Sequence, residues 1–320
     1  MDSNYRRGAI YALAAVSIWA GWSAMTRLAV TTGLDAWDIP ALRFGVAGVL
    51  LFPVVVRRGL ALDRLGWLGL CGLVAGTGAP YALVVAFGLH LAPAYDAGAL
   101  NPGCMPLFVA LIGTAILREK PSAAQTIGLA LILSGALIVI AWRGATWSMS
   151  RSFGDALFLA ASLLTACYTV ILRRSKLDPL HAAALVSSVS LLIYAPFYVA
   201  IRGLALARLP PAGLIVQIIF QRIVVTIVSL VLYGRAVLIL GAANGSAFGA
   251  LVPALSAVLA IPLLREWPAP SGWVGIALIS AGVYLASGAP LPKPPAPRKR
   301  ARQRPCQPGE SITRTRRCHR

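Results

Sequence analysis

Long apolar stretches alternate with short polar segments along almost the whole chain. Apolar residues make up 58% of the 320 positions, and glycine, proline and charged residues fall between the stretches. A helix of about 20 apolar residues crosses the roughly 30 Å hydrocarbon core of a bilayer. The pattern therefore predicts an all-α polytopic membrane protein. Its ten expected spans are residues 9–30, 38–56, 66–89, 94–117, 123–142, 154–172, 180–201, 213–234, 242–264 and 271–288.

The second half of the chain repeats the first. A shift of 147 residues gives eleven identities across residues 106–135, and hydropathy alone does not explain matched prolines or a matched Arg-Glu pair. Each half contains five spans, an odd number, so the second half must cross the membrane with opposite polarity. We therefore expect two inverted five-helix repeats, residues 9–143 and 154–288, an organisation typical of secondary transporters. The most informative matches are Pro106/Pro253, Arg118-Glu119/Arg265-Glu266, Pro121/Pro268, Gly128/Gly275, Gly135/Gly282 and, at a shift of 146, Arg27/Arg173.

Composition excludes several classes of protein. Charged residues make up 12% of the chain, whereas a soluble domain carries about a quarter, so a soluble enzyme is excluded. The five cysteines include no CxxC spacing, which argues against a zinc or redox site. The chain contains no GxxxxGK[ST] phosphate loop. We expect no cofactor and no metal.

Basic residues are divided unequally between the alternating loops. One set of loops carries eleven Lys and Arg residues and the other carries six, and the richer set is expected on the cytoplasmic face. Both termini then lie in the cytoplasm, residues 1–8 as a short tail and 289–320 as a basic, disordered one. The predicted location is the cell membrane, which is the inner membrane in a bacterium.

The C-terminal tail holds ten Lys and Arg residues among residues 290–320. Such a segment is suited to contact anionic membrane lipid. No aromatic residues are interleaved with the basic ones, so we expect no nucleic-acid partner. The sequence leaves both a monomer and a homodimer open.

Several short motifs recur in the apolar spans and at their ends. They are Trp19-Ala20-Gly21, Leu42-Arg43-Phe44, Met105-Pro106-Leu107-Phe108, Arg118-Glu119-Lys120-Pro121 and the echo of the last two in Val252-Pro253 and Arg265-Glu266. Together they resemble the EamA-type exporters of the drug/metabolite transporter (DMT) superfamily, and the resemblance covers nearly all of residues 8–288. It implies ten helices and the export or exchange of small metabolites without ATP hydrolysis.

A polar stripe crosses the eighth expected span. Arg222 lies nine residues into it, and Thr226, Ser229 and Tyr233 follow on the same helical face. An ionisable group within hydrocarbon usually faces the bundle interior or a watery cavity. We predict that this stripe binds substrate, because a guanidinium can pair with a carboxylate or phosphate. The alternative is an internal counter-charge that stabilises the bundle.

Further polar candidates lie in the first, second and sixth spans. Arg43, about one turn inside the second span, is either an outer-vestibule cation that attracts substrate or a residue that extends to the membrane interface. The family motif implies a structural role at the helix start, with substrate attraction second. Trp19 and Ser23 are matched by Thr165 and Thr169 at a shift of 146. Matched polar faces suit a central substrate path, although Ser and Thr also form ordinary interhelical hydrogen bonds.

Prolines interrupt the fourth and ninth spans, which are partners in the repeat. Irregular helices at matching positions of two repeats indicate a binding site. Asn101 beside Pro102, and Asn244 beside Gly245, are therefore candidate substrate contacts.

Asp96 is an acidic residue inside the fourth expected span. One interpretation makes it a proton-coupling group together with His90, because a desolvated carboxyl can exchange protons near neutral pH. Asp96 also follows Pro93 by three residues, so the favoured interpretation is an acid in the first helical turn that complements the helix dipole.

The leading functional hypothesis is a secondary transporter that exports small organic metabolites, such as amino acids, by alternating access. A flippase for a lipid-linked carrier is the alternative. An intramembrane enzyme is less favoured because the chain has neither an HExxH nor a GxSxG motif, and its histidines lie at span ends or in the tail. These are His90, His181 and His319.

Overall fold

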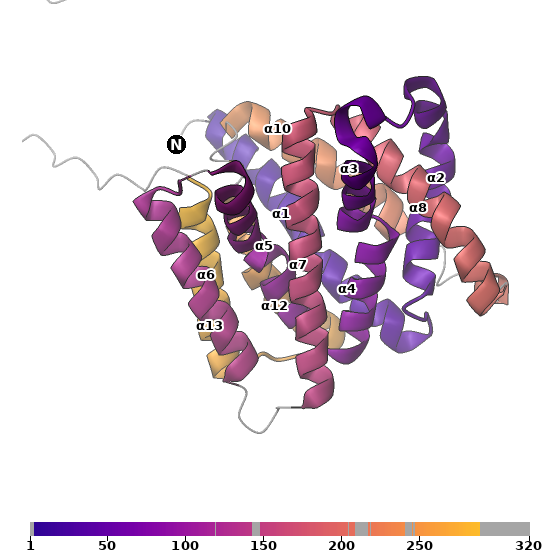
Figure 1. Cartoon of the computed structure of the whole chain (residues 1–320). Coiled ribbons are helices and arrows are strands. Elements are labelled where there is room, and N and C mark those ends of the chain that lie inside the picture. The colour runs from indigo at the N-terminus through magenta and orange to yellow at the C-terminus, as the bar shows by residue number, and fades with distance from the viewer. Residues whose placement is uncertain are drawn as a thin grey trace, which may run out of the picture. The chain divides into compact units, whose positions relative to one another are not determined.

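The computed structural model describes residues 3–118, 120–142, 148–203, 205–208, 217, 219–240, 245 and 247–288. These residues form helices joined by short connections, with no strand among them (Figure 1). The predicted tail 289–320 lies outside the described residues.

The first half contains six helices. They are α1 (Ser3–Thr32), α2 (Asp38–Arg58), α3 (Leu62–Thr77), α4 (Ala79–Leu91), α5 (Ala94–Leu117) and α6 (Ala123–Ala141).

In the second half, two long helices precede several shorter ones. The π-helical segment η3 and the 3₁₀ segments η2 and η4 lie among them. The elements are α7 (Met149–Ser175), α8 (Pro179–Arg202), η2 (Ala205–Arg208), η3 (Ile219–Val228), α10 (Ser229–Leu240), η4 (Phe248–Leu251), α12 (Val252–Leu264) and α13 (Pro270–Ala286).

Seven helical segments in the described part of the chain are long and apolar enough to cross a membrane, when α3 and α4 are taken together as Leu62–Leu91. They coincide with the first seven expected spans. Shorter apolar helices occupy parts of the remaining three: Val231–Leu240, Phe248–Leu264 and Pro270–Ala286. The multi-pass helical class is confirmed, and the count of ten spans stays a prediction.

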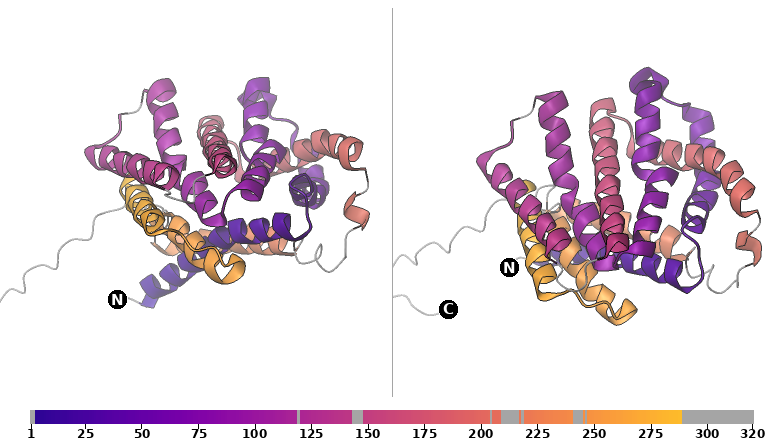
Figure 2. Two further views of the ribbon diagram at one scale, coloured as in Figure 1. Left: turned by 90° about the horizontal axis from the view of Figure 1, so that it is seen from below. Right: turned by 60° about the horizontal axis from the view of Figure 1, so that its bottom comes forward.

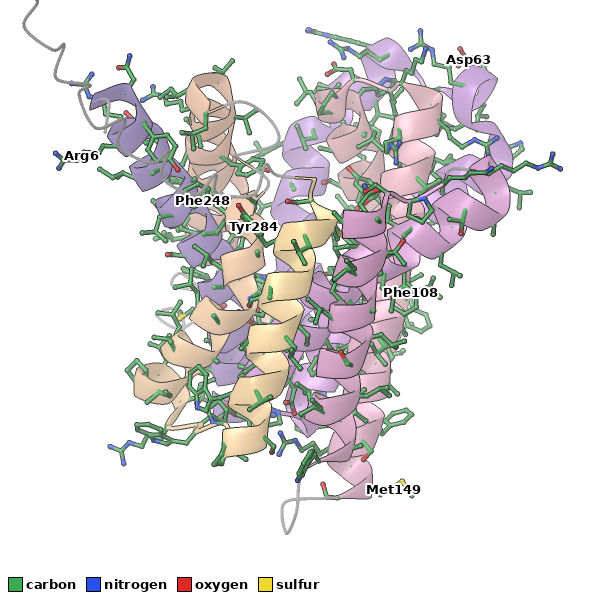
Figure 3. All side chains as sticks on the ribbon, turned by 90° about the vertical axis from the view of Figure 1, so that its left-hand side faces the viewer. Arg6, Asp63, Phe108, Met149, Phe248 and Tyr284 are labelled. Carbon is green, nitrogen blue, oxygen red and sulfur yellow. The ribbon has the colours of Figure 1, made fainter. Side chains whose placement is uncertain are left out.

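The outer surface of the helices is apolar. Leu68 is 90% exposed and Leu238 is 87% exposed, among many other large exposed aliphatic and aromatic side chains. A surface of this kind is costly in water and suits contact with lipid tails. Figure 3 places Arg6 and Asp63 toward one end of the helices and Met149 at the other.

The predicted N-terminal tail is helical from residue 3 onward, and its location in the cytoplasm stays a prediction. Helix α1 already begins at Ser3, so residues 3–8 are helical. A Cβ at Gly8 would lie 2.7 Å from Leu240 of α10, which shows that this turn is packed against another helix. Hydropathy placed the start of the span at residue 9 because Arg6 and Arg7 are charged, but charged residues continue a helix as readily as apolar ones.

Glycines bring α6 and α13 into close contact (Figures 1 and 2). A Cβ at Gly128 would lie 2.7 Å from the carbonyl oxygen of Gly282, and a Cβ at Gly135 would lie 2.7 Å from that of Gly275. The earlier glycine of one helix therefore faces the later glycine of the other, so the two helices are antiparallel. They are the fifth expected span of each half.

Other helix contacts also occur in pairs that exchange the two halves. Helix α7 packs on α4 and α5, and its repeat partner α1 packs on α10 and α12. The matched residues Arg118 and Arg265 both end their helices in the left-handed conformation, with φ of 54° and 56°. The duplication seen in the sequence is thus also present in the packing.

Candidate functional site

A cavity of about 500 Å³ lies between the two halves of the chain. Helices α1, α2, α4 and α5 of the first half and α7, η3 and α12 of the second half contribute to its wall. The lining residues are Trp19, Trp22, Ser23, Arg43, Tyr81, Ala97, Gly98, Asn101, Pro102, Tyr168, Val225, Val252 and Ser256.

A break in the third expected span positions Tyr81 at this cavity. Gly78 is extended, with φ −85° and ψ −151°, and separates α3 from α4. A Cβ there would lie 2.3 Å from the Ser190 hydroxyl oxygen, so only glycine fits. The same hydroxyl accepts a hydrogen bond of 3.0 Å from the backbone N–H of Ala79, which satisfies the first amide of α4. Tyr81 then lies in the first turn of α4.

Helices α1, α5 and α12 meet at one side of the cavity. A Cβ at Gly98 would lie 2.2 Å from the Cβ of Ser256, so the absence of a side chain on α5 allows α12 to approach. The Ser256 hydroxyl donates a long hydrogen bond of 3.4 Å to the carbonyl of Ala20 on α1. Small residues that let helix backbones approach closely are typical of membrane interiors.

Arg43 is a half-buried cation with one buried, unsatisfied donor. Its Nη1 atom is buried and has no hydrogen-bond partner among the described residues. The guanidinium lies 5.5 Å from the ring centres of Trp22 and Phe44 and 5.8 Å from that of Tyr81. These cation–π contacts stabilise its charge, but they leave the Nη1 hydrogens available to an acceptor.

Asn101 directly precedes Pro102 inside α5. Its Nδ2 donates a hydrogen bond of 2.9 Å to the hydroxyl of Tyr81. This bond joins α5 to α4 and fixes the orientation of both side chains at the cavity wall.

Trp19 connects the first half to the predicted stripe on the eighth expected span. Its Nε1 donates to the Ser229 hydroxyl at 3.0 Å, and its ring lies 5.0 Å from that of Tyr233. The structure therefore brings together two predicted groups. The side chains of Arg222 and Thr226 and the whole of Asn244 lie outside the described residues.

The other hydroxyl candidates bond mainly within their own helices, and Thr165 also donates a long hydrogen bond of 3.5 Å to the carbonyl of Gly76 on α3. Ser23, which lines the cavity, donates to the carbonyl of Ala20 at 3.0 Å. Thr165 donates to Ala161 at 3.0 Å and Thr169 donates to Thr165 at 2.8 Å. Tyr168, which lies between the two threonines in sequence, is the α7 residue that lines the cavity.

Four of the aromatic and polar lining residues were not predicted as site residues, namely Trp22, Tyr81, Tyr168 and Ser256. Trp22 could have been found, since it follows Trp19 by three residues and so shares its helical face. Tyr81 depends on the break at Gly78, and Ser256 depends on the contact with Gly98. Neither leaves a signal in a hydropathy pattern.

Asp96 is paired with an arginine. Its Oδ2 accepts a hydrogen bond of 2.8 Å from Nε of Arg151 on α7, and the same arginine donates to the Tyr95 hydroxyl at 3.0 Å. His90 is exposed at the end of α4. The acid in the first turn of α5 thus lies against a cation of another helix, which favours a structural role over proton coupling with His90.

A second ion pair lies on the same side of the molecule. Arg27, near the end of α1, forms a 3.0 Å ion pair with Glu266 and also donates to the carbonyl of Leu89. The second carboxylate oxygen of Glu266 accepts from the backbone N–H of Ala94 at 2.8 Å. Glu266 therefore ties the end of α12 to the end of α1 and to the start of α5.

The C-terminal end of α2 contacts the N-terminal end of α8. Arg58 donates to Asp178, and this hydrogen bond holds the pKa of Asp178 below its ordinary value. His181 pairs with the carbonyl of Gly59 at 2.9 Å.

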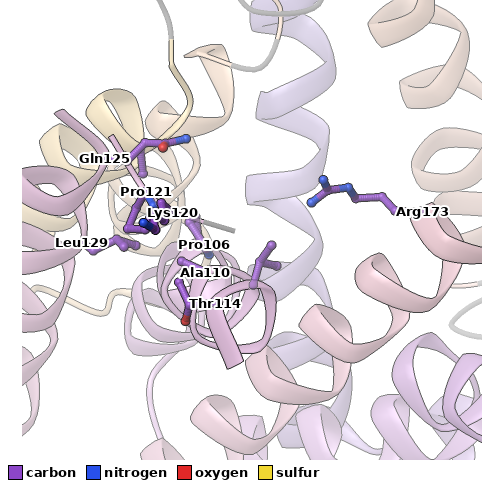
Figure 4. A pocket seen from close by; sticks show the side chains of 10 residues that line it. Pro106, Ala110, Thr114, Lys120, Pro121, Gln125, Leu129 and Arg173 are labelled. Carbon is purple, nitrogen blue, oxygen red and sulfur yellow. The ribbon is translucent and has the colours of Figure 1, made fainter. Parts of the chain in front are cut away.

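A second pocket, of about 190 Å³, lies toward the C-terminal end of α5 (Figure 4). Arg173 extends toward it from α7, across from Lys120, Pro121 and Gln125. Its wall includes Pro106, one turn beyond Pro102 of the central cavity. The two pockets are thus lined by successive turns of the same helix.

Comparison with known proteins identifies what the chain is similar to. Residues 6–141 and 152–288 each match the EamA-like transporter family. A probable terminal-alkyne amino-acid exporter of Streptantibioticus cattleyicolor is 30% identical over 269 residues, covering 80% of this chain and 86% of that protein. The uncharacterized transporter YyaM of Bacillus subtilis is 24% identical over 261 residues, covering 78% and 83%.

Two further similarities are narrower. A riboflavin transporter of Brucella anthropi is 31% identical over 160 residues, which cover 50% of this chain and 55% of that protein. A solved structure described only as "Crystal structure of protein" superposes with a TM-score of 0.58 at 19% identity, covering 87% of this chain and 96% of that one. At that identity the likeness concerns the fold alone.

Proposed function

Because the chain belongs to the EamA-like transporter family and is a membrane transporter rather than an enzyme, we propose that it exports small organic metabolites, amino acids and related compounds among them. We further propose ten spans in two inverted repeats and transport by alternating access without ATP hydrolysis. Both termini then lie in the cytoplasm.

The central cavity is the observation that carries this proposal. Both halves contribute to its wall, and inverted-repeat transporters bind substrate between their repeats near the middle of the membrane. Trp19, Ser23, Arg43 and Asn101 are the predicted substrate contacts that line it. Ser229 and Tyr233 do not line the cavity themselves but contact the lining residue Trp19.

Alternating access requires one end of the cavity to close while the other opens. Arg27–Glu266 and Asp96–Arg151 join helix ends on the side where α1 ends, and the pocket near Arg173 lies on the path toward the other side. We assign the ion pairs to the closed end of the path. The antiparallel contact of α6 with α13 supports the exchange of roles between the repeats.

Amino acids are proposed as substrates on two grounds. One relative that covers most of this chain is named as an amino-acid exporter. The cavity also combines a cation with neutral polar groups and aromatic walls, which suits molecules that carry both a charged and an apolar part.

The test compares metabolite export in cells with and without the gene, followed by efflux of the enriched compounds from proteoliposomes. Asn101→Ala should lower efflux at least fivefold, since it removes an amide from the cavity wall together with its bond to Tyr81. Ser134→Ala is the matched control, because Ser134 is exposed on α6 and bonds only to carbonyls of its own helix among the described contacts. Equal efflux from loaded vesicles with and without the protein, for every enriched compound, would refute the proposal.

A further inference from the structure

We propose that the central cavity selects amphipathic monocarboxylates, that Nη1 of Arg43 binds the carboxylate, and that an amino group on the substrate is not required. This inference rests on the proposed transport function and names the chemical class of its substrate.

The charge of the cavity supports an anionic substrate. Arg43 supplies the only ionised side chain among the described lining residues, and its buried Nη1 lacks a hydrogen-bond acceptor there. Leaving a buried charged donor unpaired costs free energy. A carboxylate would satisfy it with a charge-assisted hydrogen bond.

Two acidic groups at the ends of helices that line the cavity are engaged elsewhere. Asp96 accepts from Arg151, and Glu266 accepts from Arg27 and from the backbone of Ala94. Neither carboxylate lines the cavity. The charge of Arg43 is therefore balanced by aromatic faces alone among the described contacts, and a substrate anion would complete its coordination.

The remaining wall suits an apolar body. Trp19, Trp22 and Tyr168 present aromatic rings, and Val225 and Val252 add aliphatic surface. A cavity of about 500 Å³ falls within the range typical of small-molecule sites, whose walls are mostly apolar with a few placed polar groups. One charged end and one apolar end of the substrate would both be matched.

An ammonium group on the substrate finds no equivalent partner. The described polar lining groups other than Arg43 are neutral, namely Ser23, Asn101, Ser256 and the two tyrosines. A substrate amine would gain neutral hydrogen bonds and cation–π contacts but no ion pair, while an amine without a carboxylate would be repelled by Arg43. Amino acids and their desamino analogues should therefore bind with similar affinity.

The experiment measures binding of three probes to the purified full-length protein in lipid nanodiscs. The probes are 3-phenylpropanoate, phenylalanine and phenethylamine, which carry the carboxylate alone, both groups, and the amine alone. We expect the first two Kd values to agree within about threefold and phenethylamine to bind at least tenfold more weakly. Phenethylamine that binds as tightly as phenylalanine, or a failure of 3-phenylpropanoate to bind, would overturn the inference.

Variants of Arg43 locate the carboxylate. Arg43→Gln should weaken 3-phenylpropanoate binding at least tenfold, whereas Arg43→Lys, which keeps the charge but loses the planar fork, should give an intermediate value. Arg57→Gln is the matched control, because Arg57 is exposed on the same helix, and it should leave the Kd unchanged. If both variants fold and bind 3-phenylpropanoate as tightly as the wild type, the inference is overturned. If Arg43→Gln does not fold, wild-type affinity in Arg43→Lys overturns it.

Counterflow in proteoliposomes separates this inference from the function on which it rests. Exchange of labelled 3-phenylpropanoate that is reduced in Arg43→Lys and lost in Arg43→Gln supports both. Exchange of amines or neutral metabolites without exchange of carboxylates overturns the substrate class but leaves the transporter proposal standing. Absence of exchange for every class of solute refutes both.

Discussion

The contact between Gly98 and Ser256 determines how closely α5 approaches α12 beside the central cavity. A Cβ at position 98 would lie 2.2 Å from the Ser256 Cβ, far inside van der Waals contact, and overpacking of this kind typically costs about 1–3 kcal/mol. We predict that Gly98→Ala lowers the unfolding temperature in detergent and that Ser256→Gly restores part of the loss. A double-mutant cycle of thermal unfolding measures this coupling, and strictly additive effects would show that the helices do not meet here.

Individual site residues differed in how far the sequence could reveal them. Arg43 was accessible because an ionisable residue in an apolar span is conspicuous. Trp19 was accessible because Thr165 matches it in the repeat, as Thr169 matches Ser23. Tyr81 and Tyr168 were not, since an aromatic residue in a span is as common on a lipid-facing surface as at a cavity. Only the packing of the helices distinguishes the two cases.

At the scale of elements, Glu266 joins the ends of three helices through its bonds to Arg27 and Ala94. Under alternating access this contact must break when the cavity opens toward the side where α1 ends. We predict that Glu266→Gln favours the open state, because a neutral amide no longer pairs with the Arg27 charge. In a variant whose native cysteines are replaced, Ser23→Cys should then react severalfold faster with an impermeant thiol reagent added from that side.

Asp178→Asn provides the control for this measurement. It removes a different ion pair between helix ends, the one that Asp178 forms with Arg58. Arg58 is the last residue of α2, so this ion pair lies away from the side where α1 ends. The labelling rate of Ser23→Cys from the side where α1 ends should stay unchanged in Asp178→Asn. If both variants accelerated the labelling equally, loss of any ion pair would loosen the bundle. Glu266 would then have no specific role in opening the cavity.

The sequence revealed some positions that matter for helix packing but not the contacts that they make. Gly128, Gly135, Gly275 and Gly282 were found as identities of the repeat, but their mutual contact across α6 and α13 is a property of two helices together. The division of residues 66–89 into two helices was missed for a similar reason. The segment is uniformly apolar, and the break at Gly78 depends on Ser190 of a distant helix.

At the scale of the whole molecule, the C-terminal tail is predicted to be dispensable for transport. Its ten basic residues lie beyond residue 289, after the last helix, and none belongs to a family match. Deletion of residues 290–320 should leave efflux per inserted protein within about twofold of wild type in proteoliposomes. Loss of efflux at equal insertion would assign the tail a role in transport.

The order of the spans across the membrane is the property on which the proposed mechanism depends most. In the proposed topology five spans precede residue 143 and ten precede residue 289, so an inverted repeat requires the two positions to lie on opposite sides. We predict that alkaline phosphatase fused after residue 143 is active, whereas the same fusion after residue 289 is inactive and a green fluorescent protein there is fluorescent. The contact of α6 with α13 gives the physical reason, because antiparallel packing of the fifth spans is possible only when the halves enter from opposite faces. Active phosphatase at both positions would place them on one side, and substrate could then not pass between two repeats that exchange roles.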